Sequence, residues 1–200
     1  MKCCRVLVFI LLLLFTACAV CSIVFPQFRK TVSNTTSTTD TVHFWYRQSS
    51  RSVADVHGVV MSRTYSYRLL CLQGQVCYTV AAALSVAAAT FIGASTLFAA
   101  CWISAYNNDG LFVTSTFMTF MSFTCSSATL GLMVYTYTTT LCLDEETQIC
   151  AAKRDGYAMA EGFYLLCTTT VGTFICFIIG FGLCCSVLCC GSEIKDDDYA

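Results

Sequence analysis

Charged side chains are scarce in this chain of 200 residues, and they are missing from four long stretches. Only 12% of the residues are charged, whereas 56% are hydrophobic. No Asp, Glu, Lys or Arg lies between Arg5 and Arg29, between Arg68 and Asp109, between Asp109 and Asp144, or between Glu161 and Glu193. A water-soluble surface needs far more charge, and a spanning helix needs about 20 mostly apolar residues. The composition therefore excludes an ordinary soluble domain and predicts four membrane crossings.

Proline, histidine and clustered basic residues are also nearly missing. Pro26 is the only proline, and no ionisable residue lies inside a predicted span, which argues against a pump or a transporter with broken helices. His43 and His57 lie fourteen positions apart without neighbouring cysteines, so no metal site is predicted. Gly-rich phosphate loops, His-Glu-x-x-His and a histidine beside a nucleophile are absent, and the basic residues form no stripe for nucleic acid. We expect a non-enzymatic protein without a cofactor, whose first partner is the lipid bilayer.

The charge-free runs predict an all-α membrane protein. It would be a four-helix transmembrane bundle with a small extracellular loop or β region between spans one and two. The predicted spans are residues 6–25, 76–103, 111–137 and 162–188. Residues 26–75 and 138–161 are then the two outer loops, residues 104–110 a tight inner turn, and residues 1–5 and 189–200 the inner ends.

The first span has two interpretations. Its basic start and the small residues Ala17 and Ala19 are compatible with a cleaved signal peptide. The apolar run continues to Phe25, which favours a retained helix. Both interpretations place the following loop on the outer side.

Two features predict that both chain ends lie in the cytoplasm. Asn34 begins the only Asn-x-Ser/Thr sequon, in the first outer loop, where glycosylation requires lumenal exposure. Cys142 and Cys150 in the second outer loop suit an oxidising compartment. The basic residues point the other way, since eight of the 11 would lie outside, against the usual positive-inside bias.

The first outer loop shows two kinds of pattern. Residues 31–41 are rich in Ser and Thr and predict a flexible, glycosylated stretch. Residues 41–47 and 64–69 alternate with aromatic and β-branched side chains, which predicts short strands of a small sheet on the bundle. The alternative is an irregular loop whose aromatics lie at the membrane interface. Trp45 and its neighbours are either a packing element or a partner-binding patch.

The 16 cysteines fall into groups by position. Cys142 and Cys150 are candidates for a small disulfide loop, and Cys71 and Cys77 for a pair with each other or with that loop. Cysteines within the spans are interpreted as small apolar packing residues. The juxtamembrane cysteines are candidates for reversible palmitoylation, with unmodified thiols as the alternative; they are Cys3, Cys4, Cys184, Cys185, Cys189 and Cys190.

Small residues recur every four positions in two spans. In span two they are Ala81, Ser85, Ala89 and Gly93, and in span four Gly172, Cys176 and Gly180. Such faces let helix backbones approach closely, either within the bundle or in a homo-oligomer or a complex with other membrane proteins. Span three is rich in Ser and Thr, and the alternative function is a small neutral pore lined by these hydroxyls.

The layout and three stretches resemble the amastins, surface glycoproteins of trypanosomatid parasites; one of the stretches is the Cys-containing end of the second outer loop. Residues 41–47 (TVHFWYR) share Phe44 and Trp45 with the loop-one signature of that family, although its flanking cysteines are missing and Tyr46 replaces a glycine. Residues 156–165 (GYAMAEGFYL) resemble the family's entrance to the last span, through Tyr157, Gly162 and Phe163. The resemblance implies a divergent member: a multi-pass glycoprotein at the host–parasite interface, with a host or surface ligand on its outer loops and no enzymatic activity.

Overall fold

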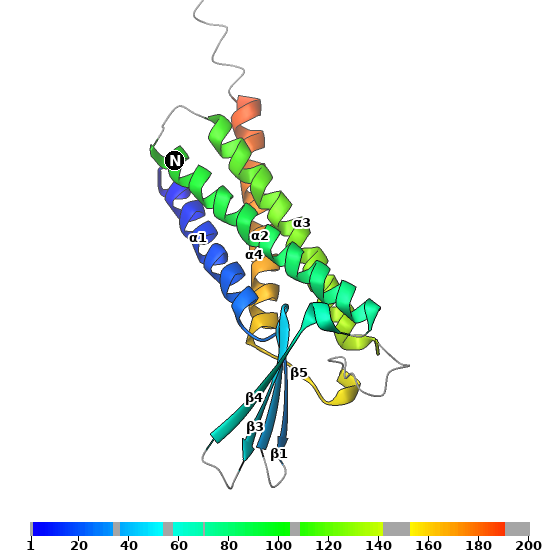
Figure 1. The fold of residues 1–200 in the computed structure, drawn as a ribbon. Helices are drawn as coiled ribbons and strands as arrows, with labels where there is room; N and C mark the ends of the chain where they lie inside the picture. The colour runs from blue at the N-terminus through cyan, green and yellow to red at the C-terminus, as the bar shows by residue number, and fades with distance from the viewer. Residues whose placement is uncertain are drawn as a thin grey trace, which may run out of the picture.

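Four long helices form a bundle, and a sheet projects from one end of it (Figure 1). The computed structural model describes residues 2–33, 37–53, 58–69, 71–104, 109–141 and 153–190. The helices are α1 (Lys2–Val24), α2 (Leu72–Ser104), α3 (Asp109–Thr138) and α4 (Glu161–Cys190). Each is long and apolar enough to cross a membrane, because about 20 residues suffice. Each coincides with one predicted span to within a few residues at either end, so the prediction of four helices long and apolar enough to span a membrane is confirmed.

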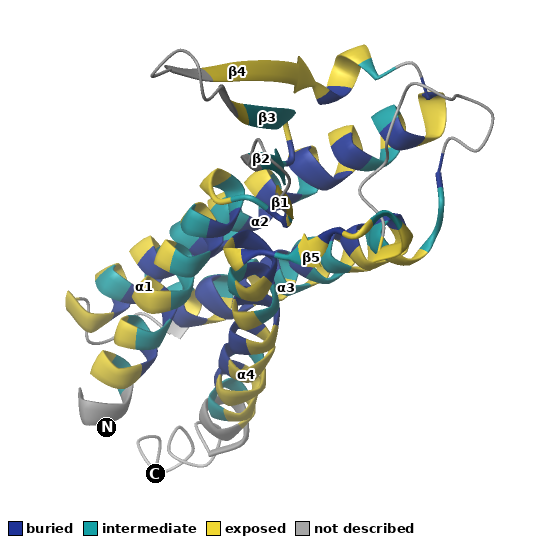
Figure 2. Cartoon of the chain, turned by 90° about the horizontal axis from the view of Figure 1, so that it is seen from below, coloured by how far each residue is buried: buried dark blue, intermediate teal, exposed yellow. Residues whose placement is uncertain are grey.

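The helices are apolar on all sides, and burial divides their faces. Inward-facing residues pack in the bundle, among them Leu12, Ile92 and Cys176, while large apolar residues such as Leu13, Phe117 and Ile178 are exposed on its outer surface. Figure 2 shows this division along each helix. A helix that is hydrophobic all round is typical of a lipid environment. The outer surface is therefore suited to acyl chains.

The first helix is an integral part of the bundle. Its Leu12 and Ala19 are almost fully buried in the cluster that holds Ile92 and Cys176. Its Thr16 hydroxyl lies 2.9 Å from that of Thr96 on α2. These contacts join α1 to α2 and α4.

The β region is larger than two short strands. It is an antiparallel sheet in the order β4-β3-β2-β1-β5, and its strands are β1 (Phe28–Ser33), β2 (Ser37–Val42), β3 (Tyr46–Val53), β4 (Gly58–Tyr65) and β5 (Ala158–Met159). The last strand comes from the second loop and pairs with Phe28 and Arg29. The fold is therefore mostly helical, and the predicted β region between the first two spans is confirmed as an antiparallel sheet, to which β5 is added from the second loop.

Two local predictions within this sheet are wrong. Residues 31–41, expected to be flexible, supply parts of β1 and β2, because β-branched threonines favour extended backbone once a partner strand is present. Residues 41–47 are not one strand, since β2 ends at Val42 and β3 begins at Tyr46. The turn between the two strands is closed by a hydrogen bond of 2.9 Å from the His43 N–H to the Tyr46 carbonyl. Likewise β4 ends at Tyr65, and the 3-10 turn Ser66–Arg68 follows.

Candidate functional site at the sheet end

Gln27 ties the end of α1 to the sheet and to α4. Its backbone N–H donates to the Val42 carbonyl at 2.7 Å, and its carbonyl accepts from the Ala160 N–H at 2.9 Å. Its side-chain Nε2 donates to the Ser22 carbonyl at 2.6 Å. The residue is fully buried, so these bonds form away from water, where they are strongest. Sequence reasoning overlooked Gln27, although a lone amide directly after Pro26 in an apolar run was a usable signal.

The start of α4 lies directly against this segment. The Gly162 N–H donates to the Pro26 carbonyl at 2.9 Å, which satisfies one of the free donors of the first helical turn. A Cβ atom on Gly162 would lie 2.6 Å from the Phe25 carbonyl oxygen and 2.8 Å from that of Pro26. Only glycine fits this approach. The structure thus assigns Gly162 a packing role at the junction.

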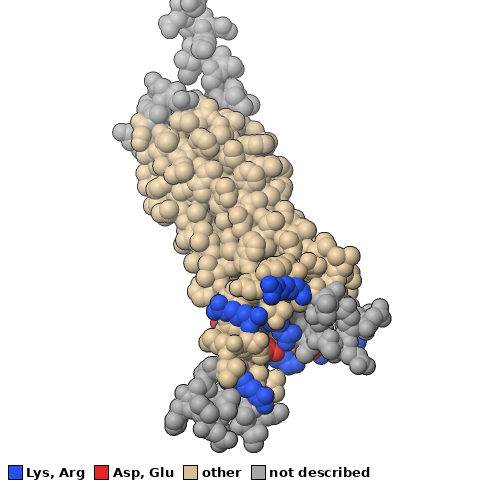
Figure 3. Space-filling model, in the orientation of Figure 1, with Lys and Arg blue, Asp and Glu red and all other residues tan. Residues whose placement is uncertain are grey.

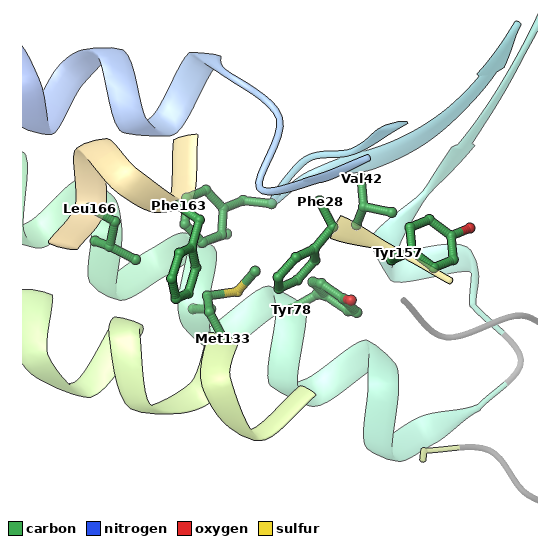
Figure 4. Close-up of a cluster of buried hydrophobic side chains, with 10 residues drawn as sticks. Phe28, Val42, Tyr78, Met133, Tyr157, Phe163 and Leu166 are labelled. Atoms are coloured by element: carbon green, nitrogen blue, oxygen red, sulfur yellow. The ribbon is translucent and has the colours of Figure 1, made fainter. Parts of the chain in front are cut away.

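Aromatic and aliphatic side chains fill the junction (Figure 4). Phe28 of β1 stacks on Tyr137 with ring centroids 5.3 Å apart and lies 6.2 Å from the Phe163 ring. The buried cluster joins strands and three helices; it consists of Phe28, Val42, Phe44, Tyr78, Ala81, Ala82, Met133, Tyr157, Phe163 and Leu166. The sheet is consequently anchored to the bundle by a shared core and is not a separate domain.

Tyr157 lies under two cations at the edge of this core. Lys30 Nζ is 5.6 Å and Arg47 Cζ 5.8 Å from its ring centroid, and Arg47 also forms a 2.9 Å ion pair with Asp40. Burial raises the pKa of Tyr157 to about 12, against the opposing effect of Arg47. The phenol is therefore neutral at physiological pH, and its ring lies against both cations.

A shallow groove of about 490 Å³ lies between β1, β5 and the start of α4. Arg29 and Glu161 form a 2.9 Å ion pair at its wall, and both side chains are close to half exposed. Solvent screens such pairs strongly. Among the described residues that line the groove, Arg29 is the cation and Glu161 the anion.

A row of stacked rings continues along the other side of the sheet. His43 stacks on Tyr46 at 4.5 Å, Tyr46 meets Tyr65 edge-on at 6.5 Å, and Tyr65 stacks on Tyr67 at 5.5 Å. Burial lowers the pKa of His43, although its bond with the Val24 carbonyl acts in the opposite direction. Trp45 belongs to the same turn and is 45% exposed, so it does not pack in the core.

Charge is concentrated at the sheet end of the molecule. On the face drawn in Figure 3, Lys and Arg side chains gather at that end, and the bundle surface shows none. Several of these cations lie on aromatic faces, including Arg63 on Tyr46 and Arg68 on Tyr67. A cation on a ring keeps its charge, and the positive-inside bias counts basic residues rather than net charge, so these side chains still point to the opposite orientation.

The cysteines differ in redox state. Cys71, directly before α2, is disulfide-bonded, whereas Cys77 is a free thiol, so the two do not pair with each other and the disulfide expectation for Cys77 is corrected. Cys142 and Cys150 lie outside the described residues, as does Asn34.

The palmitoylation candidates lie at the opposite end of the bundle. Cys184 and Cys185 are free thiols near the end of α4, and Cys185 is exposed. Cys184 Sγ lies 3.7 Å from the Thr116 hydroxyl. Cys3, Cys4, Cys189 and Cys190 fall within α1 and α4 by backbone position, and their side chains lie outside what the structure describes.

Two serine hydroxyls of the third span bond to a neighbouring helix. Ser95 and Ser115 each donate to the other's carbonyl, at 2.9 and 3.0 Å, and Ser122 donates to the Ala88 carbonyl at 2.9 Å. The buried hydroxyls of α3 all donate to main-chain carbonyls; they are Ser115, Thr116, Thr119, Ser122, Ser126, Thr129 and Thr136. The Ser115 and Ser122 hydroxyls thus bond α3 to α2, and the other five hydroxyls bond to carbonyls of α3 itself.

The small-residue face of α4 is also used inside the bundle. A Cβ atom on Gly172 would lie 2.2 Å from the Phe15 ring of α1, and one on Gly180 would lie 2.9 Å from the Thr116 hydroxyl of α3. Gly93 on α2 has no neighbour within 4 Å of such an atom. In the described part of the chain, no three His, Cys, Asp or Glu side chains gather as a metal site would require.

The residues that carry the amastin resemblance occupy different environments. Phe44, Tyr157 and Phe163 are buried in the junction core, Gly162 makes the close approach, and Trp45 is exposed. No protein-family model matches the chain, and a search of curated proteins finds no similar sequence. The resemblance therefore stays a prediction.

Proposed function

We propose that the chain is a non-enzymatic membrane protein of the cell surface, which displays its five-stranded sheet on the outer side of the plasma membrane. The disulfide at Cys71 is the observation that carries this proposal. Disulfides persist in oxidising compartments and are rare in the cytosol. Because Cys71 lies at the sheet end, the sheet belongs outside, and the opposite end of the bundle belongs in the cytoplasm.

The form of the sheet supports an interaction role. Strand β4 lies at the edge of the sheet, and its Val60 and Met61 are more than half exposed. An open edge with apolar side chains can pair with an extended segment of another protein. A surface or host ligand bound by the outer face, as the resemblance to the amastins implies, is compatible with this geometry.

The alternative, a pore lined by span three, has less support. The hydroxyls that would line it are buried and donate to carbonyls, whereas a neutral pore needs hydroxyls that are free to solvate a passing molecule. Solute-selective flux through the purified protein in liposomes would favour the pore and contradict the display role.

Topology mapping tests the proposal. Glycosidase treatment is expected to shift the wild-type protein and the Thr35→Ala variant, which keeps the sequon, but not Thr36→Ala, which removes it. A C-terminal epitope should resist protease on intact cells. Peptide mapping without reduction should link Cys71 to Cys142 or Cys150 and leave Cys77 free. A surface-exposed epitope together with a reduced Cys71 would reverse the orientation and refute the proposal.

A further inference from the structure

Exposed aromatic and basic side chains form a collar where the sheet meets the bundle. The collar consists of Trp45, Tyr65 and Tyr67, which are 44–58% exposed, together with Arg63 and Arg68. It is continuous through the backbone, since the Ser66 N–H donates to the Trp45 carbonyl at 2.8 Å. Large exposed aromatics beside cations mark a binding surface.

The collar lies at the level of the last turn of α1 and the first turn of α2. His43 stacks on Tyr46, whose ring meets that of Tyr65. The Nδ1 atom of His43 lies 3.1 Å from the carbonyl oxygen of Val24, the last residue of α1. Gln75 in the first turn of α2 donates through Nε2 to the Tyr67 carbonyl at 2.8 Å. The exposed Phe25 and Leu72 continue the apolar helix surface up to the collar. Tyrosine and tryptophan favour this boundary between hydrocarbon and water.

The arginines of the collar differ from those beside carboxylates. Arg29 and Arg47 form ion pairs, whereas Arg63 and Arg68 form none within the described part of the chain. Arg63 lies 5.1 Å from the Tyr46 ring and donates through Nε to Gln48, and Arg68 lies 5.7 Å from the Tyr67 ring. A guanidinium group on an aromatic face keeps its edge N–H groups available for a phosphate.

We propose that the collar binds the headgroups of the membrane in which the helices lie, with Trp45, Tyr65 and Tyr67 in the interfacial layer and Arg63 and Arg68 on lipid phosphates. The collar thereby holds the β3–β4 side of the sheet at the membrane surface while the far end of the strands extends away from it. This inference does not depend on which side of the membrane the sheet faces.

The two tryptophans make a direct test possible, because Trp45 belongs to the collar and Trp102 to the far end of α2. The Trp102→Phe variant in nanodiscs reports Trp45 alone. Its emission should be blue-shifted, and phosphatidylcholine brominated near the carbonyl should quench it more than lipid brominated near the chain end. Subtracting the signal of Trp45→Phe from that of wild type measures the same quantity without altering Trp102.

A second arm tests the arginines. Brominated phosphatidylglycerol should be enriched over phosphatidylcholine next to Trp45, by a factor on the order of five for each arginine. Arg63→Gln with Arg68→Gln should abolish that enrichment. Arg51→Gln should retain it, because Arg51 lies three residues, about 10 Å, beyond Gln48, the strand partner of Arg63. Quenching of Trp45 by aqueous iodide but by neither lipid would refute the collar, and an enrichment unchanged by the double variant would refute the phosphate contacts.

Discussion

Replacing Gly162 by alanine is expected to loosen the junction between α1, the sheet and α4. The added Cβ atom would lie 2.5 Å from Gln27 Nε2, 2.6 Å from the Phe25 carbonyl oxygen and 2.8 Å from that of Pro26. Two of these atoms belong to the backbone and cannot rotate away. Since carbon–oxygen contacts are normally about 3.3–3.6 Å, the start of α4 must move by roughly 0.7 Å.

The expected cost follows from three contributions. Overpacking costs about 1–3 kcal/mol, and loss of the 2.9 Å bond from Gly162 to Pro26 costs about 1 kcal/mol. The lower entropy of alanine in the unfolded chain offsets about 0.4–1 kcal/mol. We therefore expect a net loss of about 1–3 kcal/mol in the free energy of unfolding, which corresponds to a fall in melting temperature of about 2–12 °C.

Thermal melting followed by tryptophan fluorescence in detergent micelles measures this effect. Gly131→Ala is the matched control, because a Cβ atom there meets nothing within 4 Å; it should melt within a few degrees of wild type. If Gly162→Ala melts at or above the control, the close approach of α4 to Pro26 is not part of the folded protein and the reasoning fails.

Three further predictions concern single contacts. Gly172→Ala should destabilise the bundle by about 1–3 kcal/mol through the Phe15 ring, and Phe15→Ala in the same chain should recover part of the loss; a melting curve equal to wild type would contradict this. Because burial lowers the pKa of His43 below 6.5, the unfolded chain binds the proton more readily, so stability from this residue is complete above pH 6.5 and falls as the pH drops below it. A pH series of melting temperatures should show that fall in wild type and a flatter curve in His43→Gln. Arg29→Gln should change stability by less than about 1 kcal/mol, since its pair with Glu161 is close to half exposed; a larger loss in a denaturant titration would show that the pair is shielded from water.

Several junction contacts were beyond sequence reasoning because they join distant parts of the chain. Arg29 meets Glu161, and Gln27 bonds to Ala160, across more than 130 positions. No periodicity within β1 or α4 indicates that these ends meet. The pairing of β5 with β1 has the same origin, and it explains why a two-residue strand was not predicted. The sequence singled out Gly162 and Phe163 only through the resemblance to the amastins, and it predicted no contact between Gly162 and Pro26.

The sequence alone determined the four helices that are long and apolar enough to span a membrane. Such a helix depends on a local property, a run of apolar residues long enough to cover the hydrocarbon core while its backbone bonds to itself. The sequence pattern also predicted that Val42 and Phe44 share a face, and both are buried, although a turn interrupts the strand there. Tertiary structure decided which hydroxyls meet, which cysteine of the pair Cys71 and Cys77 is oxidised, and how the sheet joins the bundle. In lipid, apolar side chains gain little by facing one helix rather than another, so the choice of neighbours depends on shape and hydrogen bonds between remote residues.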